Sequence, residues 1–261
     1  MKSLSRHFVV YILSFICLTL NIIQPVFACS KIMSWNDDPP YSFIDSAKPE
    51  QVQGISVDIV KTILNRFDCD LELIKMPWAR ALESLKSGRI DILSGAFKTP
   101  ERQEFAYYSS VADYSPNILF LRSGEEVKWK INSLADIIGS QFKLGVQINV
   151  SYSQEFELLK QQALFSQHLL SNSSRVALWR MLSLSRIDGV IADKTTAMIE
   201  LNHLKLNDKI KPSPIIISNE PAFFAFSKST NLRNFVDEFD AVYLQLISDG
   251  TITEIENSYL D

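Results

Sequence analysis

The chain has 261 residues, a formal net charge of −4 at pH 7 and 46% hydrophobic residues. This apolar content suits a globular protein with a sizeable core, and a mildly acidic chain has no electrostatic basis for binding nucleic acid. The length allows either one large domain or two smaller domains with separate cores.

The first 28 residues are typical of a secretory signal. Lys2 and Arg6 precede an apolar run of 13 residues, Phe8 to Leu20, and small residues occupy the expected cleavage positions. A membrane-spanning helix needs about 20 residues, so a retained anchor is the weaker alternative. We expect residues 1–28 to be removed and the protein to be exported to the periplasm, which moves the formal charge from −4 to −6 because Lys2 and Arg6 are lost.

Two cysteines, Cys29 and Cys69, remain in the exported chain. Each begins a strand-like segment, CSKIMSW and CDLELIKM, and adjacent parallel strands would bring both sulfurs to one sheet edge. Because the compartment is oxidising, we expect a disulfide, and closing its loop of about 41 residues is worth about 4 kcal/mol. The alternative is a lipoprotein lipidated at Cys29, although Phe27 is bulky where a lipobox needs a small residue.

Strand and helix patterns alternate through the first part of the chain. CSKIMSW is followed by the turn-like NDDPPYSF, the amphipathic helix ISVDIVKTILNRF, the strand LELIKM, the helix WARALESLKSG and the strand RIDILSG. This β-α-β-α-β order predicts a parallel sheet covered by helices on both faces.

The segment SGAFKTPERQEF, residues 94–105, opens a further helix with an unexpected cation. Thr99 suits the N-cap and Pro100 the first helical position, yet Arg102 occupies the first turn. A cation there opposes the helix dipole by ~0.3 to 1 kcal/mol. We infer that another interaction has selected Arg102.

The second part of the chain repeats the α/β pattern. ALWRMLSLSRIDGVIAD echoes ALESLKSGRIDILSGA in its helix, its Arg-Ile-Asp and its apolar strand, which favours two α/β lobes. SPNILFLRSGEE and PAFFAFSKS are strand-like, and FKLGVQINVSYSQEF predicts a strand, a turn and a helix. Helical patterns follow in KTTAMIEL, LRNFVDEFDAVYLQLISDG and ITEIENSYL.

Common catalytic and metal-binding motifs are absent from the sequence. There is no GxGxxG, GxxxxGK[ST], GxSxG or HExxH, and we expect His168 and His203 to be surface residues. We therefore expect no metal and no cofactor.

Several side chains fall at strand ends or in the adjoining turns. Asp193 follows the apolar run GVIA and precedes a helix, so it is either an N-cap or a ligand group beyond the end of a strand. Trp35, Tyr41 and Trp78 are candidates to line a cleft. Phe43 is expected in the core, and Asp37 and Asp38 are expected to be turn residues.

Five motifs together resemble the family 3 periplasmic solute-binding proteins, which include the polar amino-acid-binding components of ABC transporters. They are PPYSF, GISVDIVKTILNRF, SLKSGRIDILSGAFKTPER, RIDGVIAD and LISDGTITEIENSYL. The resemblance implies an α/β clamshell of the type II periplasmic-binding class, each lobe a mostly parallel sheet flanked by helices. It implies a first lobe of residues 29–113 and 221–261, a second lobe of residues 114–220, and a monomer that closes over a small ligand.

The resemblance also implies roles for individual residues. Arg102 matches the arginine that pairs with the ligand α-carboxylate, and Asp193 matches the aspartate that accepts the ligand ammonium. Further positions of the implied ligand site are Gly95, Phe97, Thr99, Asn149 and Val150.

The sequence departs from the family pattern at two of these positions. Phe97 and Val150 stand where the family places small hydroxyl residues, so the ligand need not be a standard α-amino acid. The aromatic side chains of Trp35, Trp78 and Phe97 suggest a bulky or aromatic ligand.

The leading hypothesis is a non-enzymatic receptor for an amino-acid-like solute, working with an ABC permease. The alternative is an exported enzyme similar to cyclohexadienyl or arogenate dehydratases, which resemble this family. That chemistry needs a general acid in the cleft, and the sequence offers no clear Glu or His candidate. A sensor or interaction module is disfavoured because the chain ends at Asp261 without a signalling segment.

Overall fold

The computed structural model of the chain describes residues 29–45, 47–113 and 115–260. The expected signal segment, residues 1–28, lies outside the described residues. In the part of the chain that is described, no helix combines the length and the apolar character needed to cross a membrane.

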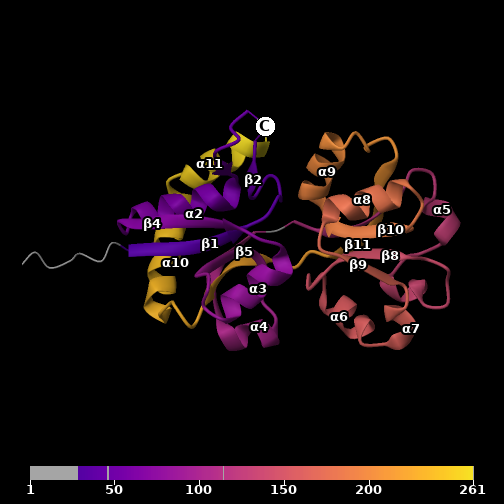
Figure 1. Ribbon diagram of the computed structural model, residues 1–261, viewed down its shortest axis with the longest axis horizontal. Helices are drawn as coiled ribbons and strands as arrows, with labels where there is room; N and C mark the ends of the chain where they lie inside the picture. Colours follow the sequence, from indigo (N-terminus) through magenta and orange to yellow (C-terminus); the bar gives the residue numbers. More distant parts are fainter. Residues whose placement is uncertain (1–28, 46, 114, 261) are drawn as a thin grey trace, which may run out of the picture.

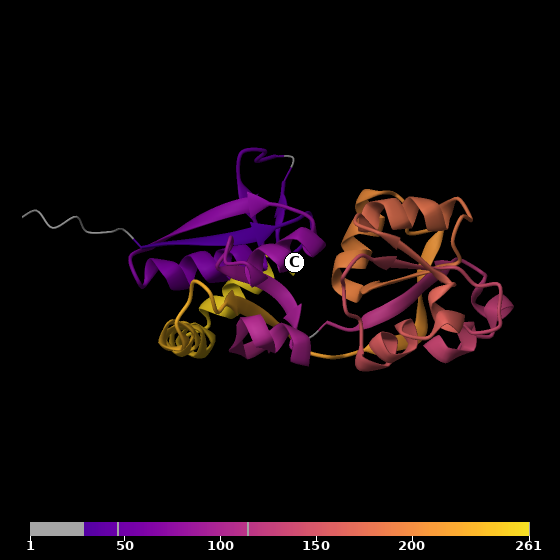
Figure 2. The ribbon, with the colours of Figure 1, turned by 60° about the horizontal axis from the view of Figure 1, so that its bottom comes forward.

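The strands form two five-stranded sheets that lie side by side in the molecule (Figure 1). In spatial order, the first sheet contains β4 (Cys69–Lys75), β1 (Cys29–Trp35), β5 (Ile92–Phe97), β12 (Ala222–Ser227) and β6 (Ala106–Asp113). The second contains β11 (Ile210–Ser218), β7 (Asn117–Arg122), β10 (Gly189–Asp193), β8 (Leu144–Gln147) and β9 (Leu169–Asn172). We call the first sheet with its helices lobe 1 and the second sheet with its helices lobe 2. The chain passes from lobe 1 to lobe 2 after β6 and returns before β12 (Figure 2).

Each sheet is mixed, with one strand opposed to the rest. In lobe 1, β1 runs parallel to β4 and β5, whereas β12 is antiparallel to β5 and β6. In lobe 2, β8 runs parallel to β9 and β10, whereas β7 is antiparallel to β10 and β11. The expectation of mostly parallel sheets flanked by helices is confirmed. A two-stranded hairpin of β2 (Phe43–Ile44) and β3 (Val52–Gln53) follows β1.

Helices cover both faces of each sheet. In lobe 1 they are α2 (Ile55–Asn65), α10 (Arg233–Ser248) and α11 (Thr251–Leu260) on one face, and α3 (Trp78–Lys86) and α4 (Pro100–Phe105) on the other (Figures 1 and 2). In lobe 2 they are α5 (Glu126–Trp129), a 3-10 turn η1 (Leu134–Ile137), α6 (Gln154–Lys160), α7 (Ala163–Ser166), α8 (Arg175–Ser183) and α9 (Lys194–His203). Separate apolar clusters fill the layers of each lobe, so the two lobes have cores of their own.

The echo in the sequence corresponds to the same structural unit in each lobe. Helices α3 and α8 are each followed by an Arg-Ile-Asp segment and a buried strand. Asp91 Oδ2 accepts a hydrogen bond from the Ile32 N–H at 2.8 Å, and Asp188 Oδ2 accepts one from the Lys143 N–H at 2.9 Å. Each aspartate therefore ties the start of its strand to a neighbouring strand.

The structure contains the predicted disulfide between Cys29 and Cys69. Cys29 and Cys69 are register partners in the parallel pair of β1 and β4. The inference that two adjacent parallel strands bring the sulfurs together is therefore confirmed.

Among the described strands, the hairpin strands β2 and β3 and three strands of the two large sheets were not predicted. β9 is only four residues long, and β6 lies in the polar segment AYYSSVAD. β11 contains Pro212 and Pro214 and lies at the edge of its sheet, where a missing N–H leaves no partner unsatisfied. The expectation for His168 was also wrong, because its ring is half-buried and its Nδ1 lies 2.9 Å from the Phe142 carbonyl. His203 is exposed, as expected.

Candidate functional site

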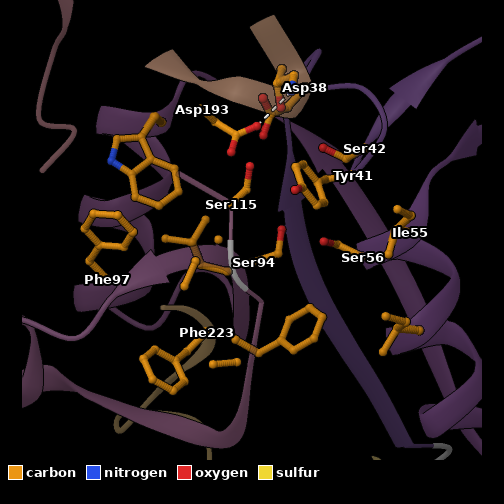
Figure 3. A pocket seen from close by; sticks show the side chains of 18 of the residues that line it. Asp38, Tyr41, Ser42, Ile55, Ser56, Ser94, Phe97, Ser115, Asp193 and Phe223 are labelled. Atoms are coloured by element: carbon orange, nitrogen blue, oxygen red, sulfur yellow. Dashed lines mark hydrogen bonds between the residues drawn. The ribbon is translucent and has the colours of Figure 1, made fainter. Parts of the chain in front are cut away.

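A cavity of about 370 Å³ lies between the two lobes. Its walls include the ends of β1, β5 and β10, the start of α2 and the turns beside them (Figure 3). Most of the sequence-predicted site residues line it: Trp35, Tyr41, Trp78, Gly95, Phe97, Arg102, Val150 and Asp193. Thr99 and Asn149 are not among the lining residues, although both contact residues that are.

Arg102 is held in place by the start of α4. The Thr99 side chain caps the helix, accepting a hydrogen bond from the Arg102 N–H at 3.3 Å. The Arg102 side chain then turns inward, and the residue is only 7% exposed. Its two terminal nitrogens donate to the Phe97 carbonyl of lobe 1 and the Asn149 carbonyl of lobe 2, each at 3.2 Å.

Arg102 is a buried cation that has no acidic partner among the described residues. Within the described residues, no carboxylate forms an ion pair with its guanidinium. Burial accordingly lowers the pKa of Arg102 from its ordinary value. A guanidinium has five N–H donors, and two carbonyls leave donors for a further acceptor. Buried charges are normally paired, so an anion in the cavity would complete this site.

Asn149 contributes through its main chain. Its carbonyl accepts hydrogen bonds from Arg102 and from Trp78 Nε1, the latter at 3.0 Å, so it joins lobe 2 to two side chains of lobe 1. Its φ of 60° lies in the left-handed region, which asparagine tolerates better than most residues. The Trp78 ring also lies 5.7 Å from the Arg102 guanidinium carbon.

The structure shows that Asp193 is an N-cap, one of the two interpretations of the sequence, and places the residue in the cavity wall. It caps α9, because its Oδ1 accepts a hydrogen bond from the Thr196 N–H at 2.8 Å, and it also lines the cavity. Burial raises the pKa of the Asp193 carboxyl, while hydrogen bonds from Ser115 and Thr196 act in the opposite direction. In the described part of the chain, no cationic side chain forms an ion pair with Asp193.

Asp38 and Arg175 form an ion pair across the cavity that sequence reasoning missed. Arg175 Nη2 of lobe 2 lies 2.5 Å from Asp38 Oδ1 of lobe 1, so Asp38 forms an interlobe ion pair in addition to the turn role that we expected. Arg175 also forms a two-pronged pair with Glu200, at 2.8 Å and 3.0 Å. Burial lowers the pKa of Arg175, but Glu200 and Asp38 raise it more, so the net shift is well upward. Arg175 begins α8, and a cation in a first turn was the signal that had identified Arg102.

Other lining residues carried no signal in the sequence. Serine hydroxyls line the cavity at Ser34, Ser42, Ser56, Ser94, Ser115 and Ser151, so hydroxyl groups are present even though Phe97 and Val150 lack them. Glu256 of α11 also lines the cavity, which places a carboxyl group where the sequence offered none. Within the described residues there is no cluster of side chains that could hold a metal ion.

The family model of the bacterial extracellular solute-binding proteins, family 3, matches residues 31–261. The chain belongs to this family. The family fold is a binding fold, and the predicted resemblance is confirmed over nearly all of the described residues.

Solved structures support the same fold. A histidine kinase sensor domain with similarity to periplasmic binding proteins matches with a TM-score of 0.75 at 18% identity, covering 90% of this chain and 96% of that one. A mutant of ArgBP from T. maritima matches with a TM-score of 0.74 at 20% identity, covering 88% and 94%. The substrate binding protein of an amino acid ABC transporter matches with a TM-score of 0.71 at 19% identity, covering 88% and 98%. No curated protein matches the chain.

Proposed function

We propose that the protein is a periplasmic solute-binding protein that captures a small amino-acid-like ligand between its two lobes. The observation that carries this proposal is the pair of unmatched charges in one cavity: Arg102 on lobe 1 and Asp193 on lobe 2. The lobes in this proposal are residues 29–113 with 221–261, and residues 114–220.

A zwitterion satisfies both charges. Its carboxylate takes the remaining donors of Arg102, whose planar guanidinium suits two parallel hydrogen bonds. Its ammonium donates to Asp193, whose carboxyl is otherwise desolvated at a cost. Because the two side chains come from different lobes, a ligand that contacts both favours the closed arrangement.

The remaining parts of the proposal concern the setting of the protein. We assign it to the periplasm, as a monomer that delivers its ligand to an ABC permease. The match to the substrate binding protein of an amino acid ABC transporter supports this assignment. The match to a sensor domain makes signal detection the competing use of the same binding step.

The test combines a ligand screen with one substitution. Purified protein is screened by thermal shift against amino acids, because a ligand at 100 times its dissociation constant adds about 2.7 kcal/mol of stability. For the best ligand, titration calorimetry of Arg102→Ala should show at least about a tenfold loss of affinity, as expected for removal of a charge-assisted pair.

The matched control is Arg233→Ala, because Arg233 is exposed and pairs only with its helical neighbour Asp237 among the ion pairs observed in the described residues. It should leave the affinity unchanged. An unchanged affinity in Arg102→Ala would remove the carboxylate role of Arg102.

Glu256 keeps a second function open. A carboxyl group at the cavity wall is the kind of general acid that a dehydratase-like enzyme needs. Incubation of the purified protein with prephenate or arogenate, followed by product analysis, tests this function. Turnover that is lost in Glu256→Gln would replace the receptor proposal.

A further inference from the structure

The cavity continues beyond its charged groups into an apolar region of lobe 1. Asp38 and Asp193 lie at the top of Figure 3, Ser56 and Ser94 lie below them, and Phe223 lies at the bottom. The apolar lining comes from α2, β5, β6 and β12, namely Ile55, Ile59, Leu93, Val111, Phe223 and Phe224. A bound molecule that spans the cavity would therefore meet charge at one end and hydrocarbon at the other.

Within the described residues, the carboxylates that line the cavity already take part in interactions with the protein. Asp38 forms an ion pair with Arg175, which also pairs with Glu200. Glu256 already takes part in an interaction of its own. Asp193 is the carboxylate assigned to the ligand ammonium. A guanidinium or a second ammonium that lay against the apolar walls would be costly, because it would be an unpaired buried charge.

We propose that the ligand is an α-amino acid, or a close relative, with a large apolar side chain that enters the apolar part of the cavity beside Phe223. This inference rests on the proposed function, because Arg102 and Asp193 orient the ligand. Moving an apolar side chain from water into the cavity lowers the free energy of the complex. Each methylene that a hydrophobic pocket accommodates typically changes the preference between two ligands by roughly 10- to 200-fold.

The first experiment compares amino acids that share the main-chain groups and differ in the side chain. Titration calorimetry with phenylalanine, leucine, alanine and arginine should show phenylalanine or leucine binding at least about tenfold more tightly than alanine or arginine. Binding of the preferred ligand should have a negative heat-capacity change, the marker of apolar burial.

Two substitutions locate the side-chain pocket. Phe223→Ala removes apolar surface from the cavity lining, and Val111→Phe enlarges another side chain of the lining and so reduces the space in the cavity. Phe223 and Val111 are both half-buried, so the fold should tolerate the changes. Each should lower the preference for phenylalanine over alanine by at least about fivefold. The control is Phe235→Ala, because Phe235 is half-buried in lobe 1 and is not part of the cavity lining. It should leave the preference unchanged.

The outcomes separate this inference from the proposed function. Tight binding of alanine or arginine, lost in Arg102→Ala, would keep the receptor function and overturn the apolar side chain. An unchanged preference in both pocket variants, with folding verified by circular dichroism, would also overturn it. Absence of binding by every amino acid would overturn the proposed function itself.

Discussion

Replacing Glu200 by glutamine tests whether the buried network around Arg175 holds lobe 2 together. Glu200 is 5% exposed, pairs with Arg175 through both oxygens, and accepts a hydrogen bond from Trp179 Nε1 at 2.6 Å. The substitution keeps the shape of the side chain and removes its charge. Arg175 then keeps Asp38 as its remaining carboxylate partner.

The expected destabilisation is about 3 kcal/mol. Removing one partner of a buried ion pair costs about 3–5 kcal/mol, and the lower value applies because Asp38 still offsets the charge of Arg175. For a chain of this size, 1 kcal/mol moves the thermal midpoint by about 2–4 °C. Glu200→Gln should therefore lower the midpoint by about 6–12 °C.

Guanidinium unfolding and scanning calorimetry at pH 7 measure this loss. The control Glu238→Gln changes an exposed residue of α10 and should shift the midpoint by less than about 1 °C. The double variant Arg175→Met with Glu200→Gln removes the uncompensated charge, keeps an acceptor for Trp179 Nε1 and should recover part of the loss. A cost below about 1 kcal/mol in Glu200→Gln would refute the reasoning, because it would mean that water already screens the pair.

Two further predictions concern the disulfide and the pH dependence of stability. The double variant Cys29→Ser with Cys69→Ser removes the disulfide, which closes a loop with a sequence separation of 40. Urea titrations should show that the free energy of unfolding falls by about 4 kcal/mol. A loss below about 1 kcal/mol would contradict the chain-entropy model. Burial raises the pKa of Asp193, so the folded state binds a proton more readily than the unfolded state, and this residue costs stability as pH rises above about 4. Asp193→Asn keeps a capping side chain but cannot ionise. The thermal midpoint of the variant minus that of the wild type should therefore increase as pH rises from about 3 to about 7. A difference that stays constant with pH would show that Asp193 affects stability only as a cap.

The parts of the fold that could be predicted from sequence are those fixed by local pattern. The period of apolar residues placed α2 and α10, and the paired positions of Cys29 and Cys69 identified two adjacent strands. The two Arg-Ile-Asp segments revealed the repeated unit in the sequence. They recur because the aspartate of each segment accepts a hydrogen bond from a main-chain N–H at a neighbouring strand. β11 could not be predicted, because its prolines are tolerated only through its place at a sheet edge, and that place depends on the whole sheet.

Arg102 and Arg175 show why the candidate site could be only partly predicted. Both arginines lie in the first turn of a helix, against the helix dipole, and that local conflict is visible in the sequence. What each arginine binds is decided by residues far away in the chain. Arg175 pairs with Asp38 and Glu200, whereas the side-chain hydrogen bonds of Arg102 in the described part of the protein go only to carbonyl groups. A buried cation already matched by two carboxylates has little to gain from an anion, and one matched by none has much to gain. The same sequence signal thus corresponds to a structural ion pair in one lobe and to a candidate ligand contact in the other, and only the tertiary structure separates the two.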